Sequence, residues 1–403
     1  MGFALAMLWV NPSLRSWFDA DYWSAMSRFE ESLRLTHSKY VDENQSAFDQ
    51  LAERAIEGMV DGLDRHSSYY SPVQYEAFQD DTHRRYLGIG VMIRKVERGV
   101  VLTKVFPGGP AEEAGLEVGE CILEAQGESL KELELEGISS RIKGAKDSFV
   151  SLLVLGRDET RREVEVRRDE IEVSSVEGAK LDENGTGYLH LIQFTGRSAE
   201  EIRLALRGFG EKGMSRLILD LRDNSGGLLS AAIEVADLFL PPDQLIVSVR
   251  GRDGVNLREF NSVTSKPFSV PLVILLNEGS ASASEIVAGA LSVLGRAQLV
   301  GEKSYGKGSV QTVFPLGHGA GLRLTTAMYF LPDGSTIHEQ GIEPDLLVSC
   351  NESNETKLRL QWNVNQELND KEFEELFGFR RIPDLQRIKA LELLLGADLP
   401  QDR

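Results

Sequence analysis

The chain has 403 residues, enough for two or three domains that each bury a core. Apolar residues make up 41% and charged residues 27%, which is ordinary for a globular protein. The formal net charge of −19 argues against a nucleic-acid binder, because phosphate contacts need a basic face, and equally against docking to anionic lipid.

The cysteines and the N-terminus say little about the cellular compartment. Cys121 and Cys350 lie far apart without zinc-type spacing, so we expect two separate thiols and no metal. An apolar run over residues 3–10 is too short to span a bilayer and lacks the basic start of a signal peptide. It is compatible with the end of an export signal or with a helix packed on the protein, and no other segment reaches transmembrane length.

The first half of the chain changes from a helical to a β-rich pattern. Apolar positions recur at helical spacing between residues 13 and 80, and a turn-rich segment over residues 64–74 ends this part. From residue 86 short strands alternate with glycine-containing turns, and residues 110–116 predict a short helix. This pattern indicates a small β-rich module of about eighty residues.

Beyond residue 170 strands and helices alternate, which predicts an α/β layer with largely parallel strands. Strands are expected at 187–194, 216–222, 244–250, 271–276 and 297–301, and helices at 198–210, 228–240 and 284–295. Two β-patterned segments follow at 309–316 and 321–331, and residues 372–396 are helical and amphipathic. The predicted parts are an N-terminal helical region (1–85), the β-rich module (86–169), the α/β core (170–350) and a C-terminal helical region (351–403).

Three serines alternate with alanines in GSASASE, residues 279–285, where a predicted strand turns into a helix. A serine hydroxyl is a weak nucleophile unless a base removes its proton, and no histidine lies nearby in the sequence. An unprotonated lysine can serve instead, and burial in an apolar pocket favours the neutral amine. Lys307 follows the serines after one helix and one strand, an arrangement that can bring its amine close to a hydroxyl at the helix start.

Lys307 has two other interpretations. Residues 301–308, GEKSYGKG, nearly match the phosphate loop GxxxxGK[ST], but glycine stands at the hydroxyl position and a β pattern follows instead of a helix. A plain exposed turn lysine is the second alternative. On an extended strand positions 307 and 311 face the same side, so Gln311 is expected to orient the lysine amine.

Acyl transfer also needs amide donors that face the developing oxyanion. One is the amide after the nucleophile, at a helix start that favours negative charge. A second donor is expected from DLRDNSGGLL, residues 220–229, where two glycines permit close approach of bare backbone. An ordinary turn between strand and helix is the alternative for this loop.

These motifs resemble, in order and over nearly the whole chain, those of the carboxyl-terminal processing peptidases of family S41. The core motifs are residues 217–229, 277–291 and 300–316, and the stretches 86–91 and 108–120 resemble the family's PDZ domain. The resemblance implies a multidomain α/β (α+β) fold, with a ClpP/crotonase-like protease core, an inserted PDZ domain over 86–169 and helical terminal regions.

The resemblance also assigns roles to residues. It places the nucleophile on Ser282, the general base on Lys307 and an orienting side chain on Gln311. The oxyanion donors fall on the amide of Ala283 and on one glycine of the SGG turn, Gly226 or Gly227.

The expected carboxylate-binding loop of the PDZ domain is LGIG, because its glycines leave backbone amides unobstructed. The loop comprises Leu87, Gly88, Ile89 and Gly90, beside an apolar pocket that Ile89, Val91 and Ile93 are expected to line.

The implied protein is a serine endopeptidase that captures protein or peptide substrates by their C-termini and cleaves nearby. No metal or cofactor is expected, and no nucleic acid. The resemblance further implies gating by PDZ movement, self-association through the helical terminal regions, and export to the periplasm or cell envelope, with a cytoplasmic location as the alternative. A catalytically silent PDZ scaffold and a nucleotide-binding enzyme are the competing functions.

Overall fold

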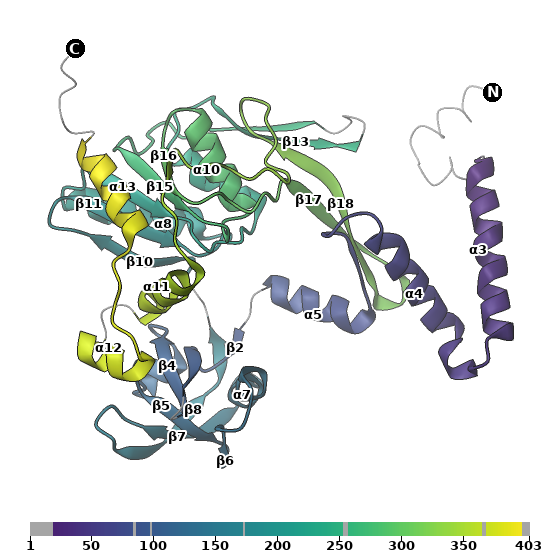
Figure 1. Cartoon of the computed structure of the whole chain (residues 1–403), viewed down its shortest axis with the longest axis horizontal. Helices are drawn as coiled ribbons and strands as arrows, with labels where there is room; N and C mark the ends of the chain where they lie inside the picture. The colour runs from purple at the N-terminus through teal and green to yellow at the C-terminus, as the bar shows by residue number, and fades with distance from the viewer. Residues whose placement is uncertain are drawn as a thin grey trace. The chain divides into compact units, whose positions relative to one another are not determined.

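The computed structural model describes residues 19–83, 86–96, 99–171, 174–252, 257–364 and 368–396. The apolar run at residues 3–10 lies outside these ranges. The chain divides into two compact units, one formed by residues 1–82 with 311–325 and the other by residues 83–310 with 326–403 (Figure 1).

The first unit is mainly helical, as predicted. It contains helices α3 (Ala20–Lys39), α4 (Phe48–Asp61) and α5 (Pro72–His83), with a short 3-10 turn before α4. Asp19 caps α3 by accepting from two backbone amides of its first turn.

The expected turn-rich segment over residues 64–74 is confirmed only in part, since residues 65–66 form a turn but the rest is largely strand and helix. It contains strand β1 (Ser68–Tyr70), which pairs antiparallel with the start of β18 (Gly321–Phe330), and α5 begins at Pro72. The local sequence pattern could not show this pairing, because the partner strand β18 is far away in the sequence. The pairing satisfies the backbone hydrogen-bonding groups of residues 68–70.

In the second unit, residues 86–171 form an antiparallel module. Its sheet has the order β3-β4-β5-β7-β8, with β6 on β5, and β2 pairs separately with β9. The strands are β2 (Tyr86–Gly88), β3 (Val91–Val96), β4 (Gly99–Val105), β5 (Cys121–Ala125), β6 (Glu128–Ser129), β7 (Phe149–Leu155), β8 (Arg161–Arg167) and β9 (Asp169–Ile171). The predicted short helix is α6 (Pro110–Glu113), and a second helix, α7 (Leu135–Ile142), was not predicted.

The α/β layer is a six-stranded sheet in the order β10-β11-β12-β15-β16-β19, and it is parallel from β11 onward. The strands are β10 (Val176–Leu181), β11 (Thr186–Leu191), β12 (Arg216–Asp220), β15 (Leu272–Leu276), β16 (Gln298–Gly301) and β19 (Leu346–Leu347). The predicted parallel layer is therefore confirmed.

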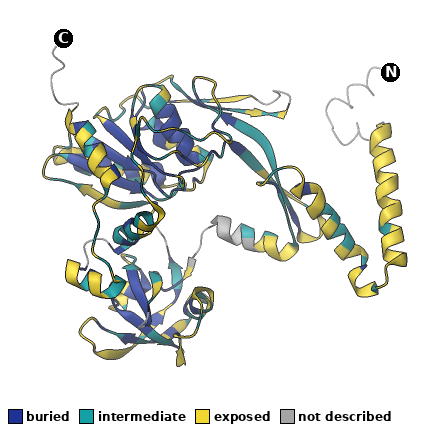
Figure 2. Cartoon of the chain, viewed as in Figure 1, coloured by how far each residue is buried: buried dark blue, intermediate teal, exposed yellow. Residues whose placement is uncertain are grey.

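Helices cover both faces of this sheet, so its central strands are buried (Figure 2). Helices α8 (Ser198–Glu211), α9 (Leu229–Asp237) and α10 (Ala283–Val293) pack on one face through a large apolar core. Helix α13 (Leu385–Gly396) packs on the other, where Ala390 and Leu394 contact side chains of the alternate strand positions.

One predicted strand of the α/β layer belongs elsewhere. Strand β13 (Leu245–Gly251) pairs antiparallel with β14 (Arg258–Asn261) and with β18 in a different sheet, and β17 (Ser309–Pro315) also pairs with β18. The prediction was wrong because an apolar run indicates a buried strand without indicating its partner. The C-terminal region begins with α11 (Glu352–Val364) and α12 (Asp370–Phe377).

The two thiols are separate, as expected. Cys121 is buried in β5 and Cys350 is partly exposed, and neither forms a disulfide. Among the residues that the structure describes, no helix is both long enough and apolar enough to span a bilayer.

Candidate active site

The three core motifs meet because they follow three neighbouring parallel strands. Strands β12, β15 and β16 are adjacent, so the loops 221–228, 277–282 and 302–308 leave the same carboxyl edge of the sheet. Ligands of α/β sheets bind at this edge, where loops can place polar groups without disturbing the core.

Ser282 occupies a strained position between β15 and α10. It is the N-cap of the helix, with φ 56° and ψ −110°, a backbone conformation that residues other than glycine rarely adopt. The neighbouring serines are buried, and their hydroxyls donate to the carbonyls of Leu221 (from Ser280) and Asn224 (from Ser284), both at 2.8 Å. Ser280 is thus a turn residue, and Ser282 and not Ser284 is the N-cap of the helix.

The carboxylate of Glu285 holds the serine turn and the lysine segment together. Its Oε2 accepts from the amides of Ser282 at 2.7 Å and Lys307 at 2.9 Å. Its Oε1 accepts from the Gly306 amide at 2.7 Å and from the Ser304 hydroxyl at 2.5 Å. Glu285 is fully buried, so four donors compensate the desolvation of its charge. It lies in the first turn of α10, and the sequence did not predict its role as a bridge.

Lys307 lies in an irregular, closely packed segment and is itself half-buried. The amide of Glu339 donates to the carbonyl of Gly306 at 2.9 Å. A Cβ placed on Gly308 would lie 2.5 Å from the amide nitrogen of His338. The two glycines that flank the lysine therefore permit the tight approach that the sequence indicated. Strand β17, and not a helix, follows, which argues against a phosphate loop.

Gln311 lies inside β17, whereas Lys307 precedes that strand, so the strand-alternation argument for the pair was wrong. Within the unit formed by residues 1–82 and 311–325, Gln311 Nε2 donates to Thr325 Oγ1 at 3.3 Å, and Thr325 Oγ1 donates to Asp64 Oδ1 at 3.2 Å. Burial would raise the pKa of Asp64, but hydrogen bonds from the Ser67 hydroxyl and from nearby amides outweigh it and lower that pKa.

The loop 221–228 lies directly against the serine turn. A Cβ on Gly226 (φ 104°) would lie 2.8 Å from the Ala281 carbonyl oxygen, 2.9 Å from the Cβ of Ser282 and 3.0 Å from the Ala283 amide nitrogen. Only a glycine permits this contact, as the sequence indicated.

Asn224 fixes the conformation of this loop. Its Nδ2 donates to the Leu191 carbonyl at 2.6 Å, and its Oδ1 accepts from the Gly226 amide at 2.9 Å. The next residue, Gly227, forms a parallel bridge with Phe194, whose carbonyl oxygen would lie 2.1 Å from any Cβ on the glycine. Nothing in the sequence pattern distinguished Asn224, because buried loop asparagines carry no spacing signal.

Two hydrogen bonds between Asp223 and Asn277 join the loop 221–228 to the loop 277–282. Asn277 Oδ1 accepts from the Asp223 amide at 2.8 Å, and Asn277 Nδ2 donates to Asp223 Oδ1 at 2.9 Å. Gly279 lies so close that a Cβ there would be 2.7 Å from Asp223 Oδ1. The two loops therefore form one rigid assembly around the serine turn.

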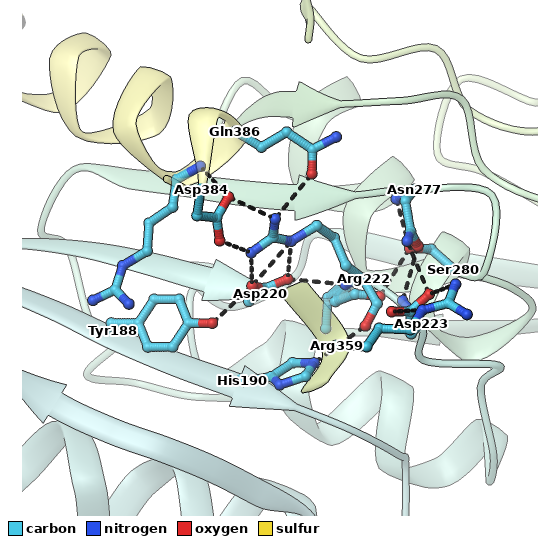
Figure 3. Close-up of polar contacts among 12 residues, drawn as sticks. Tyr188, His190, Asp220, Arg222, Asp223, Asn277, Ser280, Arg359, Asp384 and Gln386 are labelled. Atoms are coloured by element: carbon cyan, nitrogen blue, oxygen red, sulfur yellow. Dashed lines mark hydrogen bonds and ion pairs between the residues drawn. The ribbon is translucent and has the colours of Figure 1, made fainter. Parts of the chain in front are cut away.

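Beneath these loops lies a buried ion network centred on Arg222 (Figure 3). The guanidinium pairs with Asp220 on the preceding strand and with Asp384 at 2.8 Å, and its Nη1 donates to Gln386 Oε1 at 2.9 Å. The Trp362 ring of α11 lies 4.3 Å from the guanidinium carbon. The network thus anchors the start of the loop 221–228 to the C-terminal helical region.

The contacts within this network keep Asp220 and Arg222 in their charged forms. Burial alone would raise the pKa of Asp220, but the charge and hydrogen bonds of Arg222 outweigh burial and lower it from 3.8 to about 2. Burial would lower the pKa of Arg222, yet Asp220 and Asp384 raise it well above its ordinary value. The pKa of Tyr188, whose hydroxyl donates to Asp220 at 2.8 Å, is raised by burial and by that carboxylate.

The expected carboxylate loop, residues 87–90, comprises the last two residues of β2 and the two residues that follow this strand. Gly90 has φ 78°, and a Cβ there would lie 3.3 Å from Ile171 Cδ1, which explains the need for glycine. Ile89 is 1% exposed and belongs to the module's core, while Leu87 is exposed. Strand β3, which follows the loop, is at the edge of its sheet.

Two family models match the chain: peptidase family S41 over residues 185–348 and the PDZ domain over residues 77–155. A carboxyl-terminal-processing protease of Picosynechococcus sp. is 38% identical over 320 residues, which cover 78% of this chain and 77% of that protein. The carboxy-terminal processing protease CtpB of Bacillus subtilis is 32% identical over 335 residues, or 82% of this chain and 69% of that protein.

A solved structure assigned to the S41 proteases, from Bacteroides fragilis, has a TM-score of 0.56 at 19% identity and covers 91% of this chain and 94% of its own. That likeness concerns the fold. The named relatives are bacterial processing proteases, which supports a catalytic protein over a silent PDZ scaffold. The chain therefore belongs to peptidase family S41 and is a carboxyl-terminal processing serine protease that carries a PDZ domain.

Proposed function

We propose that Ser282 is the nucleophile, that Lys307 is its general base, and that Gln311 orients the lysine amine. The hydroxyl oxygen attacks the peptide carbonyl carbon while its proton passes to the neutral amine. The same proton then goes to the leaving amine, and a water molecule hydrolyses the acyl-enzyme with the lysine again as base. The observation that carries this proposal is the single Glu285 oxygen that accepts from the amides of both Ser282 and Lys307.

The oxyanion donors are the amides of Ala283 and Gly227. Ala283 is the first residue of α10, where backbone amides have no partner within the helix and the helix dipole favours negative charge. The Gly226 amide donates to Asn224 Oδ1, whereas the Gly227 amide donates to no group among the described residues. This difference favours Gly227 as the donor. Gly226 instead packs closely against Ser282.

The PDZ domain captures the substrate's C-terminal tail. The amides of residues 87–90 bind the terminal carboxylate, and the tail adds as a strand to β3. Three observations support this assignment. No described strand pairs with the outer edge of β3, Gly90 holds a positive φ, and the end of α7 lies nearby, since Lys143 Cγ would be 3.9 Å from a Cβ on Gly88.

The test compares one unfolded model protein with a free C-terminus and the same protein with an amidated C-terminus. We expect the enzyme to cleave both, with a much lower kcat/KM for the amidated form, and Ser282→Ala to cleave neither. Mass analysis of the fragments locates the cut. Equal cleavage of both substrates would contradict tail capture, and cleavage by Ser282→Ala would contradict the nucleophile.

Self-association through α3 is part of the proposal. This helix buries none of its residues, and it exposes several large apolar side chains: Tyr22, Trp23, Met26, Phe29 and Leu35. Exposed apolar surface of this kind is typical of an interface, and a second copy of the chain is the proposed occupant. Light scattering of the protein and of Trp23→Glu tests it, and equal masses at the monomer value would contradict it.

We further propose export to the periplasm or cell envelope. The apolar run at residues 3–10 and the presence of only two cysteines fit an exported protein that needs no disulfide. Fractionation of cells that produce the tagged chain tests this location, and recovery only with cytoplasmic markers would contradict it.

A further inference from the structure

Helix α11 lies between the PDZ domain and the loop that follows β12. Its apolar side chains Leu360 and Val364 are one helical turn apart and buried in a cluster with Val118 of the PDZ domain. Leu368 and Phe373, which follow α11, complete that cluster. The PDZ domain therefore packs on α11 through a closed apolar contact.

The packing is tight on the PDZ side. A Cβ on Gly119 would lie 2.8 Å from Leu368 Cδ2, so no side chain fits there without displacement. A movement of the PDZ domain must therefore also displace α11 or break the cluster, because closely packed side chains do not deform continuously.

Other side chains of the same helix hold the loop 221–228. Arg359 forms a bidentate contact with Asp223, with Nε to Oδ2 at 2.7 Å and Nη2 to Oδ1 at 2.6 Å (Figure 3). Glu355, one turn earlier, accepts from Asn277 Nδ2 at 2.8 Å, and Trp362 stacks on Arg222. One helix thus contacts two of the three loops of the proposed active site, 221–228 and 277–282.

Arg359 binds a residue, Asp223, whose backbone is strained. Asp223 has φ 58°, a left-handed conformation that costs free energy for a residue other than glycine. Arg359 and Asn277 both bind its carboxylate and so maintain this conformation. Asp223 directly precedes Asn224, whose Oδ1 accepts from the amide of Gly226, the neighbour of the proposed oxyanion donor Gly227.

We propose that Arg359 is a positioning residue for the oxyanion loop, and that α11 makes this loop depend on the position of the PDZ domain. The inference rests on the proposed function, because it assumes that residues 226–227 serve the oxyanion. Capture of a substrate tail, which loads the PDZ domain, is thereby linked through α11 to the geometry in which Ser282 attacks.

A merely structural role for this ion pair predicts a different result. The Arg359 side chain is 49% exposed and that of Asp223 is 22% exposed. Exposed ion pairs contribute little to global stability, because solvent screens them. Loss of the pair should therefore change turnover far more than the melting temperature, whereas a structural role would lower both or neither.

The first experiment uses Arg359→Gln, with Arg380→Gln as the matched control. Arg380 also pairs with a carboxylate in the C-terminal region, that of Glu374, but touches neither loop. With a short amidated peptide substrate, we expect Arg359→Gln to lower kcat ten-fold or more, with KM within two-fold and an unchanged melting temperature. Arg359→Lys should recover part of the loss. Equal kcat in Arg359→Gln and Arg380→Gln would overturn the positioning role.

The second experiment tests the link to the PDZ domain. The same amidated substrate is cleaved with and without a separate tail peptide that has a free C-terminus. We expect the tail peptide to change the wild-type kcat/KM by three-fold or more, and to have no effect on Arg359→Gln although it binds with the same Kd. The same ratio in both proteins, or a wild-type ratio of one, would overturn the link. Cleavage by Ser282→Ala would refute the proposed function separately.

Discussion

The amides of Ser282 and Lys307 donate to the same oxygen atom of one buried carboxylate, that of Glu285, although the two residues lie on either side of a complete helix and strand. The shared acceptor fixes both backbones through their amides and not through the side chains of the proposed nucleophile and general base. Catalytic groups must be held to within a fraction of an ångström, and a rigid, charged hydrogen-bond centre serves that purpose.

Replacement of Glu285 should therefore impair stability and turnover together. Glu285→Gln keeps the shape of the side chain but turns one acceptor oxygen into a donor that faces existing donors. We expect a loss of about 2–4 kcal/mol in the free energy of unfolding, and at least a ten-fold loss of kcat. Urea unfolding and peptide kinetics measure these effects. Glu278→Gln, on the exposed part of the preceding turn, is the control; equal behaviour of the two variants would contradict the bridging role.

A methyl group on Gly226 should lower turnover, because it would clash with Ser282 and Ala283. Gly226→Ala would place its Cβ within 3.0 Å of both Ser282 and Ala283, and we expect kcat to fall roughly 100-fold, the scale of losing one oxyanion donor. Gly213→Ala is a matched control, because Gly213 has a similar positive φ of 86° with no atom near its Cβ position. If both variants lose the same activity, backbone strain and not contact with Ser282 is responsible.

The hydrogen bonds from Gln311 to Thr325 and from Thr325 to Asp64 predict that Thr325 affects turnover. Thr325→Val keeps the volume of the side chain but removes the hydroxyl that accepts from Gln311 and donates to Asp64. We expect kcat to fall several-fold, and Thr325→Ser to restore it because the hydroxyl returns. Peptide kinetics of the three proteins decide the matter, and a valine variant as active as the wild type would separate this network from catalysis.

Acid should weaken the buried network at Asp220. A carboxyl group whose pKa is lowered on folding stabilises the native state above its unfolded pKa, and this stabilisation is lost as the pH falls through the folded value. For Asp220 the window runs from about pH 4 to about pH 2, with an amplitude on the order of 2 kcal/mol.

Urea unfolding of the wild type and of Asp220→Asn between pH 7 and pH 2 measures this contribution. The variant should be less stable at pH 7 by about 3–5 kcal/mol, because the buried Arg222 loses a partner, and it should show a flatter acid profile. Parallel profiles for the two proteins would contradict the assignment.

Local patterns predicted most elements, and they failed where long-range partners decide the structure. Alternating strands and helices after residue 170 predicted the parallel layer, because burial on both faces leaves apolar runs in the sequence. The same apolar signal could not place β13, whose partners are antiparallel strands of another sheet. Helix α7 was missed since its short run, residues 135–142, follows strand-like and glycine-rich segments.

The site shows the same division. Ser282, Lys307 and the two glycines stand in recognisable motifs, and the structure brings their loops to one sheet edge. Asn224, Asn277 and Arg359 were not predicted, because their importance lies in contacts between segments far apart in the chain. The argument that placed Gln311 and Lys307 on one strand face was wrong, because β17 begins after the lysine, and the role of Gln311 stays a prediction.

The most direct test of the central claim is the rate at which Lys307→Ala and Ser282→Ala cleave a defined unfolded protein, followed by mass analysis of the fragments. We expect each variant to lose roughly 10⁴-fold or more in kcat/KM while keeping the wild-type circular dichroism and melting temperature. Turnover by folded Lys307→Ala at a rate near that of the wild type would show that another group takes the proton, and would contradict the account.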